Sequence, residues 1–171
     1  IATTTAWVMS MILNLQPGEF AELSLHPAVL LILRLIMSFI GVFGFSIMFN
    51  SPVTIAASAA GIGAIANTLR LELVSLISLN AAVAAFLGAL TAGLLASLLM
   101  KRLGYPRISV TVPSIVIMVP GLYLYRAVYS MGEMSLTQSA PWLVSALLII
   151  MALPLGLIFA RIISDRSFRH C

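Results

Sequence analysis

Tyr123 and Arg126 are the two side chains of this sequence best suited to bind an anion. Residues three apart share one face of a helix, a tyrosine hydroxyl donates a hydrogen bond, and arginine favours planar, bidentate partners such as a carboxylate. Both residues follow Pro120 and Gly121, where a new helix is expected to begin. A helix N-terminus presents unpaired N–H groups and roughly half a positive charge. These features together predict a carboxylate site.

Tyr125 and Tyr129 line another face of the same expected helix. The alternative for all these side chains is an aromatic belt, with a flanking arginine, at the membrane interface. For Tyr125 and Tyr129 the sequence position supports that alternative at least as well as a binding role. Both interpretations therefore stay open.

The sequence contains little that could support catalysis. It has no Ser/His/acid set, no histidines at metal-binding spacing and no glycine-rich phosphate loop after a strand. Cys171 is the single cysteine, so neither an internal disulfide nor a cysteine metal site is expected. We therefore expect a protein that is not an enzyme and that uses no cofactor and no metal.

The composition indicates an integral membrane protein. Of the 171 residues, 61% are hydrophobic and 8% are charged, whereas a soluble domain has about 25% charged residues. In a membrane protein the formal charge of +4 reports orientation and not a nucleic-acid partner. We expect an all-α, polytopic membrane helix bundle with about five or six transmembrane segments, formed as a single domain over residues 1–171.

The expected segments are separated by prolines, glycines and charged residues. Residues 1–15 are too short to span securely, so they are expected to be either a truncated first helix or the end of an upstream segment. Polar loops are expected at residues 16–27 and 130–141. The membrane crossings are expected at residues 28–50, 52–69, 76–100, 108–129 and 142–163.

The crossing at residues 108–129 contains Pro113, Pro120 and Gly121. A proline removes a backbone donor and clashes with the preceding turn, so an unbroken helix is not expected. In lipid, a broken helix is tolerated only where protein or water satisfies the freed backbone groups. The alternatives are a proline kink without a ligand and a discontinuous helix with a binding site at the break. The residue pattern alone favours the kink.

Two arginines lie in or beside expected crossings. Arg34 is about two turns inside its helix, so it should either extend to the membrane surface or find a partner, and the first is favoured. Arg70 and Glu72 are expected just past the end of the crossing at residues 52–69. They are two apart and share no helix face. Arg70 is then either part of a membrane-boundary cluster or the wall of a polar path.

Small residues recur at four-residue spacing in two of the crossings. Such stripes let helix backbones approach closely in membranes, either within one chain or between copies. Packing within the chain is favoured here. The stripes are Ala56, Ala60 and Ala64, accompanied by Ala59 and Gly63 at the same spacing, in one crossing, and Ala84, Gly88, Ala92 and Ala96 in the next.

Basic residues predict the orientation of the chain. Two basic groups flank the last two crossings, so both can face the cytoplasm, as the positive-inside rule requires. Arg70 and Arg126 then face the opposite side, which suggests that they serve something other than orientation. The two groups are Lys101, Arg102 and Arg107, and Arg161, Arg166 and Arg169.

Three patches of the sequence resemble the threonine/serine exporter (ThrE-type) family. Residues 44–52, GFSIMFNSP, are similar to a family helix end with an F-N-x-P pattern. Residues 63–70 resemble its glycine-to-arginine segment, and residues 105–125 resemble its stretch of spaced prolines followed by Pro-Gly and tyrosine. Their order and spacing identify the small YjjB-type subunit, or the C-terminal half of longer members. Ile117 and Ser114 depart from the family pattern, which often has proline and glycine there.

The resemblance implies a bacterial-type inner-membrane exporter, or half of a two-part exporter, for small carboxylate-bearing metabolites such as threonine, serine or succinate. Beyond the lipid bilayer, it implies a larger ThrE-type membrane partner or self-association. The alternative is a non-transporting scaffold subunit that assembles with a larger membrane partner. The predicted substrate pathway comprises Asn50, Pro52, Gly63, Arg70, Pro113, Pro120, Gly121, Tyr123 and Arg126.

Overall fold

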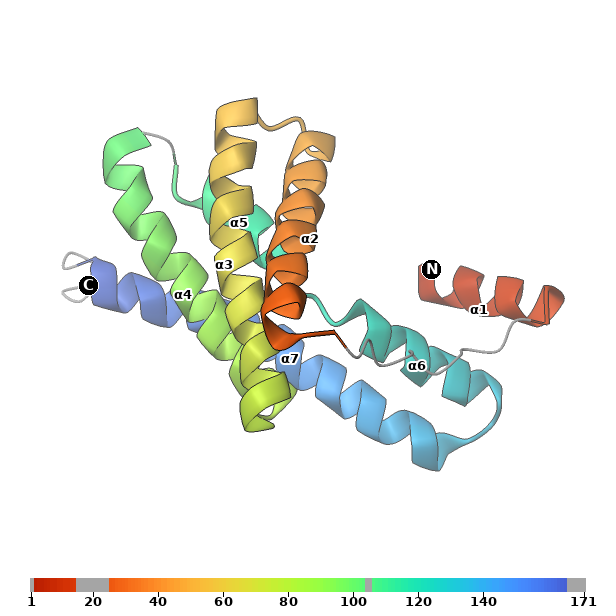
Figure 1. Ribbon diagram of the computed structural model, residues 1–171. Coiled ribbons are helices and arrows are strands. Elements are labelled where there is room, and N and C mark those ends of the chain that lie inside the picture. The colour runs from red at the N-terminus through yellow and green to blue at the C-terminus, as the bar shows by residue number, and fades with distance from the viewer. Residues whose placement is uncertain (1, 15–24, 104–105, 166–171) are drawn as a thin grey trace. The chain divides into compact units, whose positions relative to one another are not determined.

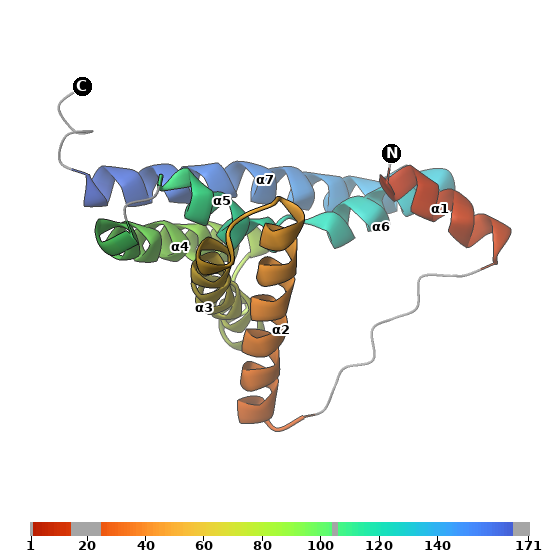
Figure 2. The ribbon, with the colours of Figure 1, turned by 90° about the horizontal axis from the view of Figure 1, so that it is seen from above.

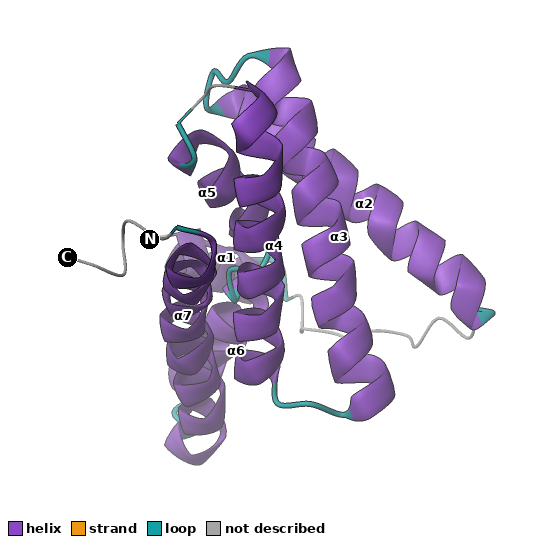
Figure 3. Ribbon diagram, turned by 90° about the vertical axis from the view of Figure 1, so that its left-hand side faces the viewer, coloured by secondary structure: helices purple, strands orange, loops and turns teal. Residues whose placement is uncertain are grey.

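The computed structural model describes residues 2–14, 25–103 and 106–165, and regular structure in these ranges is entirely helical (Figures 1 and 3). The all-α prediction is therefore confirmed. The described helices are α1 (Ala2–Ile12), α2 (Pro27–Met48), α3 (Val53–Ile77), α4 (Ala81–Leu103), α5 (Ile108–Val116), α6 (Gly121–Gly132) and α7 (Leu136–Ser164).

Four of the described helices are long and apolar enough to cross a membrane, namely α2, α3, α4 and α7. The shorter helices α5 and α6 pass the same test only when they are taken together as one broken span. Four or five crossings fit the predicted polytopic bundle. Helix α1 has 11 residues, fewer than the roughly 20 that a crossing needs.

The chain divides into two compact units. The larger unit contains residues 26–119 and 149–171, and the smaller unit contains residues 1–25 and 120–148. The larger unit thus holds α2 to α5 and the second half of α7. The smaller unit holds α1, α6 and the first half of α7, and in it α1 packs against α6.

Helix α3 is the centre of the larger unit, where it packs against α2, α4 and α5 (Figure 2). Its predicted small-residue stripe explains this position, because Ala56, Ala60 and Ala64 are fully or almost fully buried. Gly63 allows the closest approach. A Cβ there would lie 2.8 Å from Cγ2 of Val42 in α2 and 2.9 Å from the carbonyl oxygen of Ser114 in α5.

The stripe on α4 packs within the chain, as favoured from the sequence. Ala84, Ala92 and Ala96 are fully buried, and a Cβ at Gly88 would lie 3.2 Å from the carbonyl oxygen of Ala66 in α3. A second face of α4 contacts α7. There a Cβ at Gly93 would lie 2.5 Å from Cβ of Ala160. Small residues on both faces let α4 pack closely between α3 and the end of α7.

The predicted end of the third segment at residue 69 is wrong. Helix α3 continues to Ile77, and the chain turns at Ser78, which has a left-handed φ of 53°. The next helix accordingly begins at Ala81 and not at residue 76. Arg70 and Glu72 are helical residues of α3 and do not form a turn. Apolar residues surround these two charges, and the helix continues through them to Ile77.

The predicted polar loop at residues 130–141 is also wrong. Helix α6 extends to Gly132 and α7 already begins at Leu136, so the connection is only residues 133–135. The polar residues after Leu136 are compatible with a helix because they form its first turn. The backbone N–H of Gln138 donates to the carbonyl of Ser135 at 3.1 Å, and the hydroxyl of Ser139 donates to the carbonyl of Leu136 at 3.0 Å.

The predicted helix break lies at the second proline. Pro113 is inside α5 and does not end it, whereas Pro120 precedes the first residue of α6, Gly121. Between the two helices the backbone forms tighter turns, with the N–H of Met118 bonded to the carbonyl of Ile115 at 2.9 Å. Pro120 has no N–H to continue the ladder, so the helix stops and restarts as predicted.

Candidate functional site

A buried polar face on α3 is the main candidate site in the larger unit. Asn67 and Thr68 are each only 6% exposed, and the other buried residues of this helix are alanine, isoleucine and glycine. The side-chain amide of Asn67 donates to the hydroxyl of Ser38 in α2 at 2.8 Å. Ser38 is itself buried. This hydrogen bond fixes the amide group in the contact between the two helices.

Two acceptors of this face lack hydrogen-bond partners among the described residues. They are the side-chain oxygen Oδ1 of Asn67 and the hydroxyl oxygen Oγ1 of Thr68, and both are buried. Leaving a buried polar group unsatisfied costs about 1–3 kcal/mol. Native proteins seldom keep such groups without a partner such as water or a ligand. The two oxygens can therefore accept hydrogen bonds from a solute or from water.

Arg70 follows on the same helix, three residues after Asn67, so the two share a side of α3. It is half-buried, and its Cβ lies against Gly88 of α4, 3.3 Å from where a Cβ of Gly88 would lie. Gly88 thus makes room for the base of the arginine side chain. The structure places a permanent positive charge on the same helix as the two acceptors.

Gly63 and Ser114 position α5 against this helix. The hydroxyl of Ser114 lies 3.0 Å from the carbonyl oxygen of Ala59 in α3 and 2.6 Å from that of Val110 in its own helix. The absence of a side chain at Gly63 lets the backbone of Ser114 come close. Both residues therefore act by packing. Pro113, the neighbour of Ser114, is half-buried in α5.

Asn50 and Pro52 form the exposed connection between α2 and α3. Asn50 has a left-handed φ of 57°, and its N–H donates to the carbonyl of Ile47 at 2.9 Å. Asparagine tolerates this conformation better than most residues. Pro52 caps the start of α3. Their geometry gives both residues a role in the turn, and their part in a substrate pathway stays a prediction.

The predicted pair in the smaller unit shares a helix face, as its spacing requires. The guanidinium carbon of Arg126 lies 4.7 Å from the ring centroid of Trp142 in α7, and the ring of Tyr123 lies 5.7 Å from the same indole. Arg126 thus makes a cation–π contact with Trp142, a partner that the sequence did not indicate. Tyr125 and Tyr129 lie on another face, with ring centroids 6.2 Å apart.

Helix α6 begins without a side-chain cap. Pro120 occupies the capping position and its side chain makes no capping hydrogen bond. The first backbone bond of the helix joins the N–H of Leu124 to the carbonyl of Pro120 at 3.1 Å. The earlier N–H groups, from Gly121 onward, have no acceptor within the helix. This end retains the polarity that attracts anions.

The family model described as "Threonine/Serine exporter, ThrE" matches residues 34–163 of the chain. This chain belongs to the threonine/serine exporter family. The match contains α3 with its polar face, the helix break and nearly all of α7. No curated protein and no solved structure matches the sequence. Membership of this family, together with the apolar helices, makes the protein a membrane exporter.

The nine predicted pathway residues of this exporter fall into both compact units. Asn50, Pro52, Gly63, Arg70 and Pro113 belong to the larger unit, and Pro120, Gly121, Tyr123 and Arg126 belong to the smaller one. Among the first group, Gly63 and Arg70 lie on α3, the helix that carries the buried acceptors. The prediction omitted Asn67 and Thr68. The signal for them was two adjacent polar residues in an otherwise apolar, small-residue helix.

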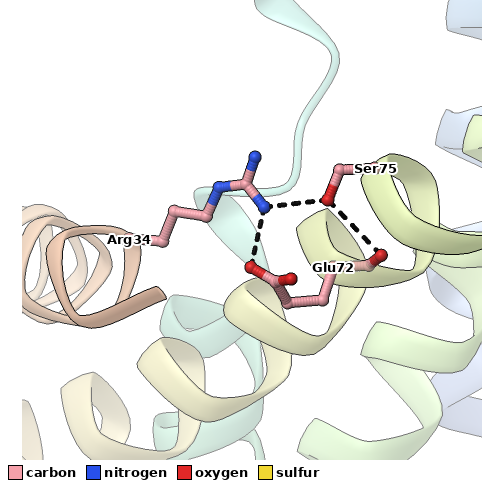
Figure 4. Close-up of polar contacts among 3 residues, drawn as sticks. All are labelled: Arg34, Glu72 and Ser75. Atoms are coloured by element: carbon pink, nitrogen blue, oxygen red, sulfur yellow. Dashed lines mark hydrogen bonds and ion pairs between the residues drawn. The ribbon is translucent and has the colours of Figure 1, made fainter. Parts of the chain in front are cut away.

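Arg34 of the exporter forms an ion pair, so it finds a partner, which was the less favoured of the two alternatives from the sequence. Its Nη1 donates to Oε1 of Glu72 in α3 at 2.7 Å and to the hydroxyl of Ser75 at 3.0 Å (Figure 4). The two charged side chains are 23% and 20% exposed. Pairing offsets the cost of placing either charge among apolar helices. The pair also links α2 to α3 beyond the buried polar face.

Proposed function

We propose that this exporter moves small carboxylate-bearing metabolites and that the polar face of α3 contacts them during passage. The observation that carries the proposal is the burial of Oδ1 of Asn67 and Oγ1 of Thr68 without hydrogen-bond partners in the described structure. A passing solute that brings hydrogen-bond donors would satisfy both oxygens. Arg70, on the same helix, would attract the carboxylate of that solute.

The chemistry of this face favours hydroxy amino acids over dicarboxylates. Threonine and serine carry an ammonium group and a hydroxyl, which are donors for Asn67 and Thr68, and a carboxylate for Arg70. Succinate as a dianion offers acceptors only, so it would leave Oδ1 of Asn67 unsatisfied and could bond only to the hydroxyl of Thr68 acting as a donor. A site built to hydrogen-bond a donor strongly rejects an analogue that lacks it. Threonine and serine are therefore the preferred solutes in this proposal.

The proposed setting is the inner membrane of a bacterial-type cell, where the chain works with a larger ThrE-type membrane subunit or domain. Its spans give the chain an apolar surface suited to lipid and to other helices. In the described residues, α2 exposes apolar side chains along most of its length, including Ile36, Met37 and Ile40. A partner helix or lipid would cover this face.

The function is tested by efflux from cells that do or do not make the complete protein, using labelled threonine, serine, alanine and succinate. We expect faster export of threonine and serine in cells that make it, and little change for succinate. Alanine keeps the ammonium and carboxylate but lacks the hydroxyl, so its rate reports the contribution of that group. If no solute leaves faster although the protein and its larger partner are both in the membrane, the scaffold alternative replaces the exporter role.

Substitution of Asn67 by leucine tests the site within that function. We expect it to lower threonine efflux about tenfold, because the loss of one hydrogen bond to a charged group is worth about 1.4 kcal/mol or more. Ser38→Ala is the matched control, since it removes the contact partner of Asn67 but leaves its Oδ1 in place. Equal losses in both variants, at equal amounts of membrane protein, would show that Asn67 acts only by fastening α2 to α3.

A further inference from the structure

A basic pocket lies at the end of the larger unit where the start of α5 meets the end of α7. Its volume is about 490 Å³. Two arginines line it, Arg107 immediately before α5 and Arg161 in the last turn of α7, together with a single carboxylate, that of Asp165. The charged lining residues thus carry a net positive charge. Neither the efflux chemistry nor the polar face of α3 uses this pocket.

Arg107 is held in place by two neighbouring helices. Its Nη2 donates to the carbonyl oxygen of Gly93 in α4 at 2.9 Å, and its Nη1 donates to the hydroxyl of Ser164 in α7 at 3.1 Å. Burial lowers the pKa of Arg107, the charge of Arg161 lowers it further, and Asp165 raises it. The three charged groups are therefore near enough to act on one another. A second anion in the pocket would relieve the repulsion between the two arginines.

The start of α5 adds to the positive potential. Arg107 occupies the capping position of this nine-residue helix and makes no side-chain capping bond to it. The pocket lining includes Ile108, the first residue of the helix. The N–H groups of Ser109 and Val110 already donate to the carbonyls of Pro106 and Arg107 at 3.0 Å and 3.2 Å, so this helix end favours an anion mainly through its dipole. Two guanidinium groups and one helix end therefore converge on the same cavity.

The rest of the pocket wall is aliphatic. Ile108, Val112 and Ile158 line it and are exposed side chains. All three belong to helices of the broken span or of α7, so their exposed surfaces suit contact with hydrocarbon. A small soluble anion would make no apolar contacts with these aliphatic side chains. A phospholipid would place its charged headgroup near the arginines and its acyl chains against the aliphatic wall.

We propose that this pocket binds an anionic phospholipid, with its phosphate between Arg107 and Arg161 and an acyl chain along the aliphatic wall. The pocket adjoins the basic residues that the orientation prediction places at the cytoplasmic face. Basic pockets between membrane helices on that side are suited to anionic headgroups. Bound lipid would fasten the start of α5 to the end of α7 and so stabilise the larger unit.

Native mass spectrometry of the full purified protein tests the proposal, with added phosphatidylglycerol, phosphatidylcholine or soluble glycerol phosphate. We expect phosphatidylglycerol to be retained over phosphatidylcholine, and glycerol phosphate to be lost. Arg161→Gln should weaken phosphatidylglycerol binding about fivefold, since one basic residue near the surface is worth about 1 kcal/mol. Asp165→Asn should strengthen it by a similar factor, because that change removes the negative charge of the pocket.

Arg126→Gln is the charge-matched control, because Arg126 lies in α6 and is not among the residues that line the pocket. We expect it to leave phosphatidylglycerol binding unchanged. Unaltered binding in both Arg161→Gln and Asp165→Asn would overturn the site. Equal retention of glycerol phosphate and phosphatidylglycerol would overturn the lipid as its ligand. Lipid binding is measured here without any transport, so its outcome does not depend on which solute the protein exports.

Discussion

Replacement of Gly63 by alanine is expected to destabilise the larger unit by up to about 2 kcal/mol. The new Cβ would lie 2.8 Å from Cγ2 of Val42 and 2.9 Å from the carbonyl oxygen of Ser114. The second contact is with backbone, which cannot rotate away, and overpacking of this kind costs about 1–3 kcal/mol. Alanine gains about 1 kcal/mol of helix propensity over glycine, which offsets only part of that cost.

Gly61 provides the matched control two positions earlier on α3. No described atom lies within 4 Å of a Cβ built at Gly61, so Gly61→Ala keeps the propensity gain without a clash. We expect it to raise the free energy of unfolding while Gly63→Ala lowers it. Unfolding in mixed detergent, followed by circular dichroism, measures both. A Gly63→Ala variant as stable as Gly61→Ala would mean that α3 and α5 are less closely packed than the structure shows.

Gly61→Ala and Gly63→Ala are expected to change the free energy of unfolding in opposite directions, and this difference shows how much can be predicted from the sequence. The stripes of small residues predicted close packing, and the structure confirms it around Gly63 and Gly88. The pattern could not show that Gly61 faces open space, because that depends on where α2, α4 and α5 lie. The restart of the helix at Pro120 was predictable for a different reason. A missing N–H is a local property of the residue itself.

The end of α3 at Ile77 could not be predicted from the sequence, because it depends on a contact with a residue far away in the chain. Two charges close together normally mark a membrane boundary, so residues 70–72 were interpreted as a turn. The partner of Glu72 is Arg34, which is 38 positions away in the chain. Without knowledge of that contact, the cost of the charges outweighs the apolar residues from Leu73 to Ile77. With it, the helix continues.

The buried polar face was partly predictable. Arg70 was identified because an arginine near an apolar run needs an explanation. Asn67 and Thr68 carry no charge, and a polar residue on a membrane helix commonly bonds to a neighbouring helix. What sets them apart is burial with acceptors left over, a property that requires the position of Ser38 and of every other neighbour. Trp142 was missed for the same reason, since its contact with Arg126 joins two helices.

Replacement of Glu72 by leucine is expected to destabilise the larger unit by about 2 kcal/mol. Removal of Glu72 leaves the charge of Arg34 among apolar helices, where the hydroxyl of Ser75 is the other contact drawn in Figure 4. A fully buried pair loses about 3–5 kcal/mol when it is broken in this way. The two side chains here are about one-fifth exposed, so a smaller loss is expected.

The double variant Arg34→Leu/Glu72→Leu should recover most of that loss, because two apolar residues replace both charges between apolar helices. Unfolding of wild type, both single variants and the double variant completes the cycle and gives the coupling between the two side chains. Strong coupling would establish that the two charges stabilise the larger unit as a pair. If Glu72→Leu instead changes stability by less than about 0.5 kcal/mol, as for an ordinary surface site, Arg34 reaches water on its own and the ion pair does not support the helix.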